Sequence, residues 1–107
     1  MTTPNQMPER ITKACLLWPD TTLDQWTMRG DTAVHCDAKV TVPAENLFGG
    51  IIRSGKVSDN AEVYGNAEVY GNAKVYGNAR VYGNARVYGN ARVYDNARVL
   101  GDARVSD

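Results

Sequence analysis

The sequence has little of what most catalytic and metal-binding classes require. Its 107 residues include one histidine and two cysteines, and twelve basic side chains balance twelve acidic ones, so the formal net charge is zero. Overall charge therefore demands no polyanionic partner, although a local basic face remains open. Cys15 and Cys36 lack metal-ligand spacing. Two isolated cysteines are typical of reduced thiols in a cytoplasmic protein, with a structural disulfide as the alternative.

Long apolar runs are also missing. Residues 1–10 are polar and lack the apolar core of a signal peptide. The longest apolar stretch, residues 14–18, is far too short to span a membrane. We therefore expect one cytoplasmic domain that has no membrane segment.

What the sequence does have is one hexapeptide repeated eight times over residues 57–104. Val holds the first place and Ala the fifth in every unit. In a strand such as Ala79 to Tyr82, Ala and Val share one face while Arg and Tyr share the other. Gly-Asn supplies the corner, because Gly and then Asn tolerate positive φ. Three units close a triangle, which predicts an all-β solenoid with three hexapeptides per coil and parallel stacking.

Fainter copies of the hexapeptide precede the clear repeat. The segments 28–33, 34–39 and 40–45 fit its frame, and two glycines within 46–50 break that frame by one residue. The prediction is an N-terminal tail and capping segment over 1–27 and a solenoid over 28–107, with an irregular corner at 46–50.

The capping segment carries the two tryptophans, Trp18 and Trp26. We expect them to cover the open end of the solenoid, with a ligand-stacking role as the alternative. The apolar residues 11–18 predict a strand or a short capping segment. Thr21 and Asp24 are spaced as in a capping box, which predicts a helical turn reaching Trp26.

The hexapeptide resembles the repeat of the bacterial transferase hexapeptide proteins, in the Val-Tyr-Gly-Asn-Ala form common in bacteria and prophages. This resemblance implies a left-handed parallel β-helix. It covers 57–104 closely and 28–45 weakly, and it departs from the family in placing Tyr second in six of the eight units. Many such proteins are called transferases from the repeat alone, but the repeat specifies a scaffold and carries no chemistry.

A period of 18 places each residue i directly under residue i+18, which predicts rows of like side chains. Tyrosines should pair as Tyr64 with Tyr82, Tyr70 with Tyr88, and Tyr76 with Tyr94. Charged side chains should form three columns: Glu62, Arg80 and Arg98; Glu68, Arg86 and Arg104; and Lys56, Lys74 and Arg92. If 46–50 counts as one short unit, Lys39 joins the third column and Glu45 the first.

Three functional hypotheses follow. The first is a non-catalytic interaction protein that presents Tyr/Arg ladders to a protein partner and forms a homo-oligomer, dimer or trimer, because Tyr and Arg are enriched at binding hot spots. By analogy, it would be a phage- or prophage-type inhibitor of a host enzyme or defence complex.

The second hypothesis is anion or nucleic-acid binding on a basic face made by Lys56, Lys74 and Arg92 with Tyr76 and Tyr94. The alternative to both hypotheses is that the charged side chains only face solvent and that the tyrosines only cover the strands.

The third hypothesis, an acyltransferase or a degenerate relative, depends on His35. The resemblance implies a histidine general base, but His35 lies in a degenerate unit, and neither an acyl-carrier loop nor an acceptor pocket is evident. One histidine cannot supply a three-histidine zinc site. Asp59, Asp95 and Asp102 occupy corner places that serve backbone needs. We therefore expect no enzyme activity, no cofactor and no metal.

Overall fold

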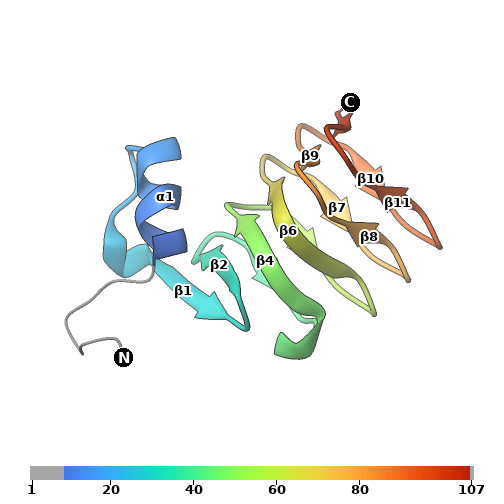
Figure 1. Ribbon diagram of the computed structural model, residues 1–107, viewed down its shortest axis with the longest axis horizontal. Coiled ribbons are helices and arrows are strands. Elements are labelled where there is room, and N and C mark those ends of the chain that lie inside the picture. The colour runs from blue at the N-terminus through green and yellow to red at the C-terminus, as the bar shows by residue number, and fades with distance from the viewer. Residues whose placement is uncertain (1–8, 107) are drawn as a thin grey trace.

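The computed structural model describes residues 9–106 and shows about four parallel coils stacked into a β-solenoid, with one short helix at the N-terminal end (Figure 1). Within these residues, no helix is long and apolar enough to cross a membrane. The elements are α1 (Glu9–Leu17), η1 (Leu23–Gln25), β1 (Trp26–Arg29), β2 (Thr32–His35), β3 (Lys39–Val40), η2 (Ala44–Asn46), β4 (Leu47–Ile52), β5 (Lys56–Val57), β6 (Glu62–Val69), β7 (Lys74–Val75), β8 (Arg80–Val81), β9 (Arg86–Val87), β10 (Arg92–Val93), β11 (Arg98–Val99) and β12 (Arg104–Val105).

The strands form three parallel stacks, and each gives the solenoid one outer face. Face 1 lies over the N-terminal halves of β4 and β6 and over β8 and β11. Face 2 lies over β2, the C-terminal halves of β4 and β6, β9 and β12. Face 3 lies over β3, β5, β7 and β10. In the clear repeat each residue pairs with the one 18 positions later, so the predicted solenoid of three hexapeptides per coil is confirmed.

The interior is filled by the first and fifth residues of the hexapeptides. The valines from Val57 to Val87 and the alanines from Ala61 to Ala85 are fully buried at these places, and the earliest coil adds Val42 and the larger Leu47 and Ile52. The outward second and sixth places stay polar or aromatic. A narrow core of small side chains therefore leaves three flat outer surfaces for Tyr, Arg, Lys and Glu.

Glycine holds the corners because the coils approach closely there. Gly65 has φ +70°, and a Cβ on it would lie 2.9 Å from the backbone nitrogen of Gly83. Two aspartates take glycine's place, Asp59 with φ 62° and Asp95 with φ 57°. The carboxylate of Asp59 accepts a hydrogen bond from the N–H of Gly77 at 3.0 Å.

The corner asparagines do not use the positive φ that Asn tolerates, because the described non-glycine residues with positive φ are the two aspartates. Their side-chain amides instead donate to the residue one coil later, at 3.3–3.4 Å. The ladders are Asn60–Asn78–Asn96, Asn66–Asn84–Asp102 and Asn72–Asn90.

The N-terminal part differs from the prediction. Residues 28–33 are not a first hexapeptide unit but most of an antiparallel hairpin, in which β1 pairs with β2. Gly30, with φ 56°, makes that turn. The segment 11–18 is mostly helix α1. The turn η1 is capped by Thr22 rather than Thr21, because the N–H of Thr22 donates to the Gln25 side chain at 2.9 Å.

The segment 46–50 is irregular, as predicted, but apart from Asn46, which ends η2, it lies within strand β4. The register of β4 on β6 shifts between Gly49 and Ile51: Gly49 pairs with Gly65, but Ile51 pairs with Glu68, one position beyond the regular partner. Lys39 does pair with Lys56. Glu45 lies in η2 and not in a strand ladder, so its predicted place in the first charged column is wrong.

Candidate binding faces

Face 3 carries an unbroken row of four cations. Lys39 pairs with Lys56, Lys56 with Lys74, and Lys74 with Arg92, all exposed. None of the four forms an ion pair with a described carboxylate. The middle of this row borders an open groove, which is lined by Lys56, Ser58, Asp59, Lys74, Tyr76 and Arg92.

Tyr76 and Tyr94 lie beside the cation row, two residues beyond Lys74 and Arg92 on the same outward side of the strands. Their rings stack with centroids 5.3 Å apart and planes 11° from parallel. Tyr94, in the later coil, is 47% exposed. The predicted basic face with its tyrosine pair is therefore assembled by the fold.

Face 1 combines a charged row with an apolar row. Arg80 Nε lies 3.8 Å from Glu62 Oε1, and Arg98 pairs with Arg80 in the next coil. Beside them, the rings of Tyr64 and Tyr82 stack at 4.7 Å and 1°.

The apolar row of face 1 is longer than predicted. Phe48 contacts Tyr64 edge-on at 6.2 Å, because Phe48 pairs with Tyr64 in the register. Phe48 and Leu100 are 56% and 49% exposed. Sequence reasoning missed Phe48, since its separation from Tyr64 along the chain is shorter than one full repeat of the coil. Leu100 could have been found, because it holds the second place of the last unit.

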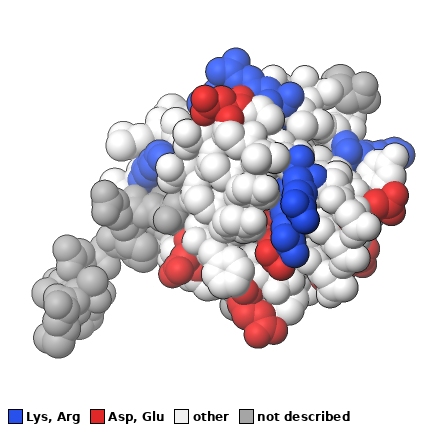
Figure 2. Space-filling model, turned by 45° about the vertical axis from the view of Figure 1, so that its right-hand side comes forward, with Lys and Arg blue, Asp and Glu red and all other residues white. Residues whose placement is uncertain are grey.

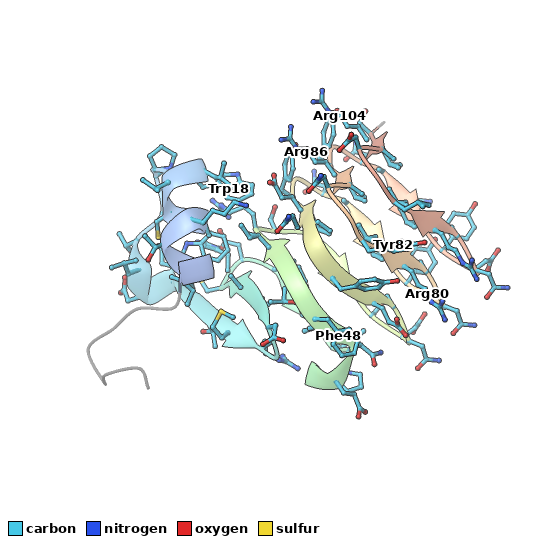
Figure 3. All side chains as sticks on the ribbon, viewed as in Figure 1. Trp18, Phe48, Arg80, Tyr82, Arg86 and Arg104 are labelled. Carbon is cyan, nitrogen blue, oxygen red and sulfur yellow. The ribbon has the colours of Figure 1, made fainter. Side chains whose placement is uncertain are left out.

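Face 2 has a similar charged row but a blocked aromatic row. Arg86 Nε lies 3.9 Å from Glu68 Oε1. Tyr70 stacks on Tyr88 at 5.1 Å, and Trp18 packs edge-on against Tyr70 at 5.6 Å. Burial, and then the Glu68 carboxylate, raise the pKa of Tyr70. Figure 3 shows Trp18 beside the early coils and Arg86 and Arg104 farther along the same edge.

The cap is held by its tryptophans, as expected. Trp26 is buried with Ile11, Ala14 and Ile51. Its indole Nε1 donates to the hydroxyl of Thr21 at 3.0 Å, and that hydroxyl donates to the Trp18 carbonyl at 2.6 Å. Both tryptophans therefore serve the closed end of the core.

His35, the candidate general base, is 2% exposed and enclosed by the cap. Its Nδ1 accepts from the Asp37 N–H at 3.0 Å and from the Arg53 guanidinium at 3.2 Å, so we assign the proton to Nε2, which faces Gln25 Oε1 at 3.3 Å. Burial, and then Arg53, lower the pKa of His35. Both ring nitrogens are therefore engaged in holding the cap to the solenoid.

The ligand atoms of His35, Cys36 and Asp37 lie within 4.8 Å of one another. The arrangement suits a metal poorly, because the Arg53 cation already occupies the Nδ1 side of the ring. Cys15 and Cys36 are free thiols.

The charges of the outer surface are grouped. On the side seen in Figure 2, basic side chains lie in separate groups, most of them with acidic side chains nearby, and not in one field of a single sign. This distribution agrees with the zero net charge and with the mixed rows of faces 1 and 2.

Comparison with known proteins supports the solenoid. The family model described as YdcK Beta solenoid repeat matches four overlapping segments, residues 73–89, 79–93, 85–99 and 91–107. Neither the curated proteins nor the solved structures contain a match to the chain. The chain is thus a β-solenoid repeat protein, and the match concerns the repeat rather than any binding face.

Proposed function

We propose that this solenoid is a non-catalytic interaction protein that binds an acidic surface of a protein partner along face 3. The observation that carries the proposal is the row Lys39, Lys56, Lys74 and Arg92, which has no ion pair among the described residues. Like charges directly opposite each other in neighbouring strands destabilise a sheet. Carboxylates of a partner would offset that repulsion, and Tyr76 and Tyr94 would add contact area beside them.

A single-stranded nucleic acid is the second candidate, because aromatic rings beside cations suit it. Two features favour the protein partner instead. Tyr76 and Tyr94 are stacked on each other, so the rings already occupy faces that bases would need. Asp59 borders the same groove, and its carboxylate would repel the phosphates of a strand that followed the groove.

The buried His35 supports the non-catalytic half of the proposal, since its ring nitrogens already have partners in Gln25, Asp37 and Arg53. The finer identity, a hexapeptide protein of bacterial or prophage type acting in the cytoplasm as an inhibitor of a host enzyme or defence complex, depends on the resemblance of the Val-Tyr-Gly-Asn-Ala repeat alone.

The test uses fluorescence anisotropy with two labelled probes, a poly-glutamate peptide and an oligo-thymidine strand. The pair Lys56→Glu/Lys74→Glu should abolish poly-glutamate binding. The matched pair Arg86→Glu/Arg104→Glu makes the same charge change on face 2 and should leave binding within a few-fold. Equal losses in the two pairs, or no poly-glutamate binding at low salt, would contradict the proposal. Tighter binding of the strand, weakening steeply with salt, would favour the nucleic-acid candidate.

A further inference from the structure

We infer that face 1 is an interface with a second copy of this chain, related by a two-fold axis parallel to the strands. The inference is independent of the proposed function, which uses face 3. It depends on two rows of side chains on face 1, one apolar and one charged. Each row complements the same row of a second copy that runs in the opposite direction.

The apolar row supplies the contact surface. It runs across successive coils as Phe48, Tyr64, Tyr82 and Leu100. The row is exposed at both ends, because Phe48 and Leu100 are among the few large apolar side chains on the surface. Figure 3 shows Phe48 and Tyr82 on one edge of the solenoid, with Arg80 close to Tyr82.

The charged row supplies the orientation. Its order is Asn46, Glu62, Arg80 and Arg98, since Asn46 precedes Leu47 as Glu62 precedes Val63. A two-fold axis parallel to the strands and midway between β6 and β8 lays each row on its own reversed copy. Glu62 then faces Arg80 of the second copy, Tyr64 faces Tyr82, and Phe48 faces Leu100. No arginine faces an arginine in this register.

The other two faces cannot pair in this way. Face 3 would place its cation row against an identical row. On face 2, Trp18 from the cap covers Tyr70 at the start of the aromatic row, so a second copy could not lie flat along it. Face 1 is thus the face that is both open along its apolar row and complementary in charge.

The size of the face predicts a weak, reversible dimer. Face 1 spans four stacked strands, spaced by roughly 4.8 Å, so its contact is short and belongs to the small-interface class below about 1,200 Å². We therefore expect a monomer–dimer equilibrium that shifts with protein concentration, and not a permanent assembly.

Sedimentation equilibrium over a range of concentrations tests the inference through charge reversal. The mass of the wild type should rise from one chain of 11.7 kDa towards two. Arg80→Glu places Glu against Glu62 of the second copy, and should raise the dimer dissociation constant at least about tenfold. The double variant Glu62→Arg/Arg80→Glu restores opposite charges across the axis, and should return the constant to within about threefold of wild type.

Face 2 provides the matched control. Arg86→Glu breaks an equivalent ion pair within the chain, at 3.9 Å against 3.8 Å, so it should cost the same stability and leave the dimer intact. Far-UV circular dichroism checks that each variant is folded. Leu100→Ser changes an exposed side chain, and should weaken the dimer without affecting the fold.

A wild type that stays monomeric at all concentrations, or that forms trimers, would overturn the inference. So would equal effects of Arg80→Glu and Arg86→Glu, or a double variant that fails to restore association. Association that survives every face 1 variant would place the contact at another surface, and would equally reject this interface.

Discussion

Replacing Gly65 by alanine should destabilise the solenoid much more than the same replacement at Gly101, although both glycines share one backbone conformation. Their φ angles are +70° and +65°. The left-handed conformation costs an L-residue about 1–2 kcal/mol at either place. A Cβ on Gly101 meets nothing within 4 Å, whereas a Cβ on Gly65 lies 2.9 Å from Gly83 N and 3.1 Å from Gly83 O.

The contact at Gly65 adds a second cost because the next coil cannot easily move away. Gly83 O accepts a hydrogen bond from Asn66 N at 2.7 Å, immediately beside the added carbon. Overpacking of this kind costs about 1–3 kcal/mol. We therefore expect a loss of about 1 kcal/mol for Gly101→Ala and about 3 kcal/mol for Gly65→Ala, a difference of up to about thirtyfold in the unfolding equilibrium constant.

A third variant separates steric crowding from hydrogen bonding. Asp59 shows how the fold accepts a side chain at this corner, with its carboxylate bonded to the N–H of Gly77. Gly65→Asp should make the same bond to Gly83, and recover about 1 kcal/mol relative to Gly65→Ala.

Urea unfolding followed by far-UV circular dichroism measures the three losses, and unchanged m-values show that the variants report one transition. Equal losses for Gly65→Ala and Gly101→Ala would refute the reasoning. Such a result would mean that the coils separate freely to admit a Cβ, and that glycine is needed at Gly65 for its φ alone.

Three further predictions concern the cap and face 3. The lowered pKa of His35 means that the folded state binds fewer protons than the unfolded state, so thermal stability should be full above pH 6.5 and decline below it, while His35→Gln removes this slope. Thr21→Val leaves the buried Nε1 of Trp26 without an acceptor, and should cost about 1–3 kcal/mol with a change in tryptophan fluorescence. Lys74→Gln removes repulsion from Lys56 and Arg92, and should raise the free energy of unfolding by about 0.2–1 kcal/mol, more at low salt.

The strict repeat made the outer rows predictable. Once three hexapeptides close a coil, simple addition of the period pairs Tyr64 with Tyr82 and Glu68 with Arg86, and the structure has both pairs. The same addition predicted the row Lys56, Lys74 and Arg92. These contacts follow from periodicity, because in near-identical coils each residue stacks on the equivalent residue one coil later.

The N-terminal end was less predictable because no period governs it. Residues 28–33 fit a six-residue frame, but Gly30 takes φ 56° and reverses the chain into a hairpin. The apolar residues of 11–18 suit a strand or a helix, and burial of Ile11 and Ala14, three positions apart on one helical face, decides for the helix. Phe48 lies on face 1 because it pairs with Tyr64, 16 positions later in the chain rather than 18. The break in the hexapeptide frame at 46–50 did not by itself specify that pairing.

Every hexapeptide supplies the same Val and Ala to the core, but the outward charged residue differs from unit to unit. Inserting or deleting repeats would therefore affect the surface and not the core. Gain or loss of one whole coil would lengthen or shorten each face and keep its chemistry. Loss of a single hexapeptide, for example residues 65–70, would leave every Val and Ala inside, but would turn each later unit by one face. Arg80 would then follow Lys56 on face 3, and Lys74 would move to face 2. The length of such a change, rather than its composition, would decide what each face could bind.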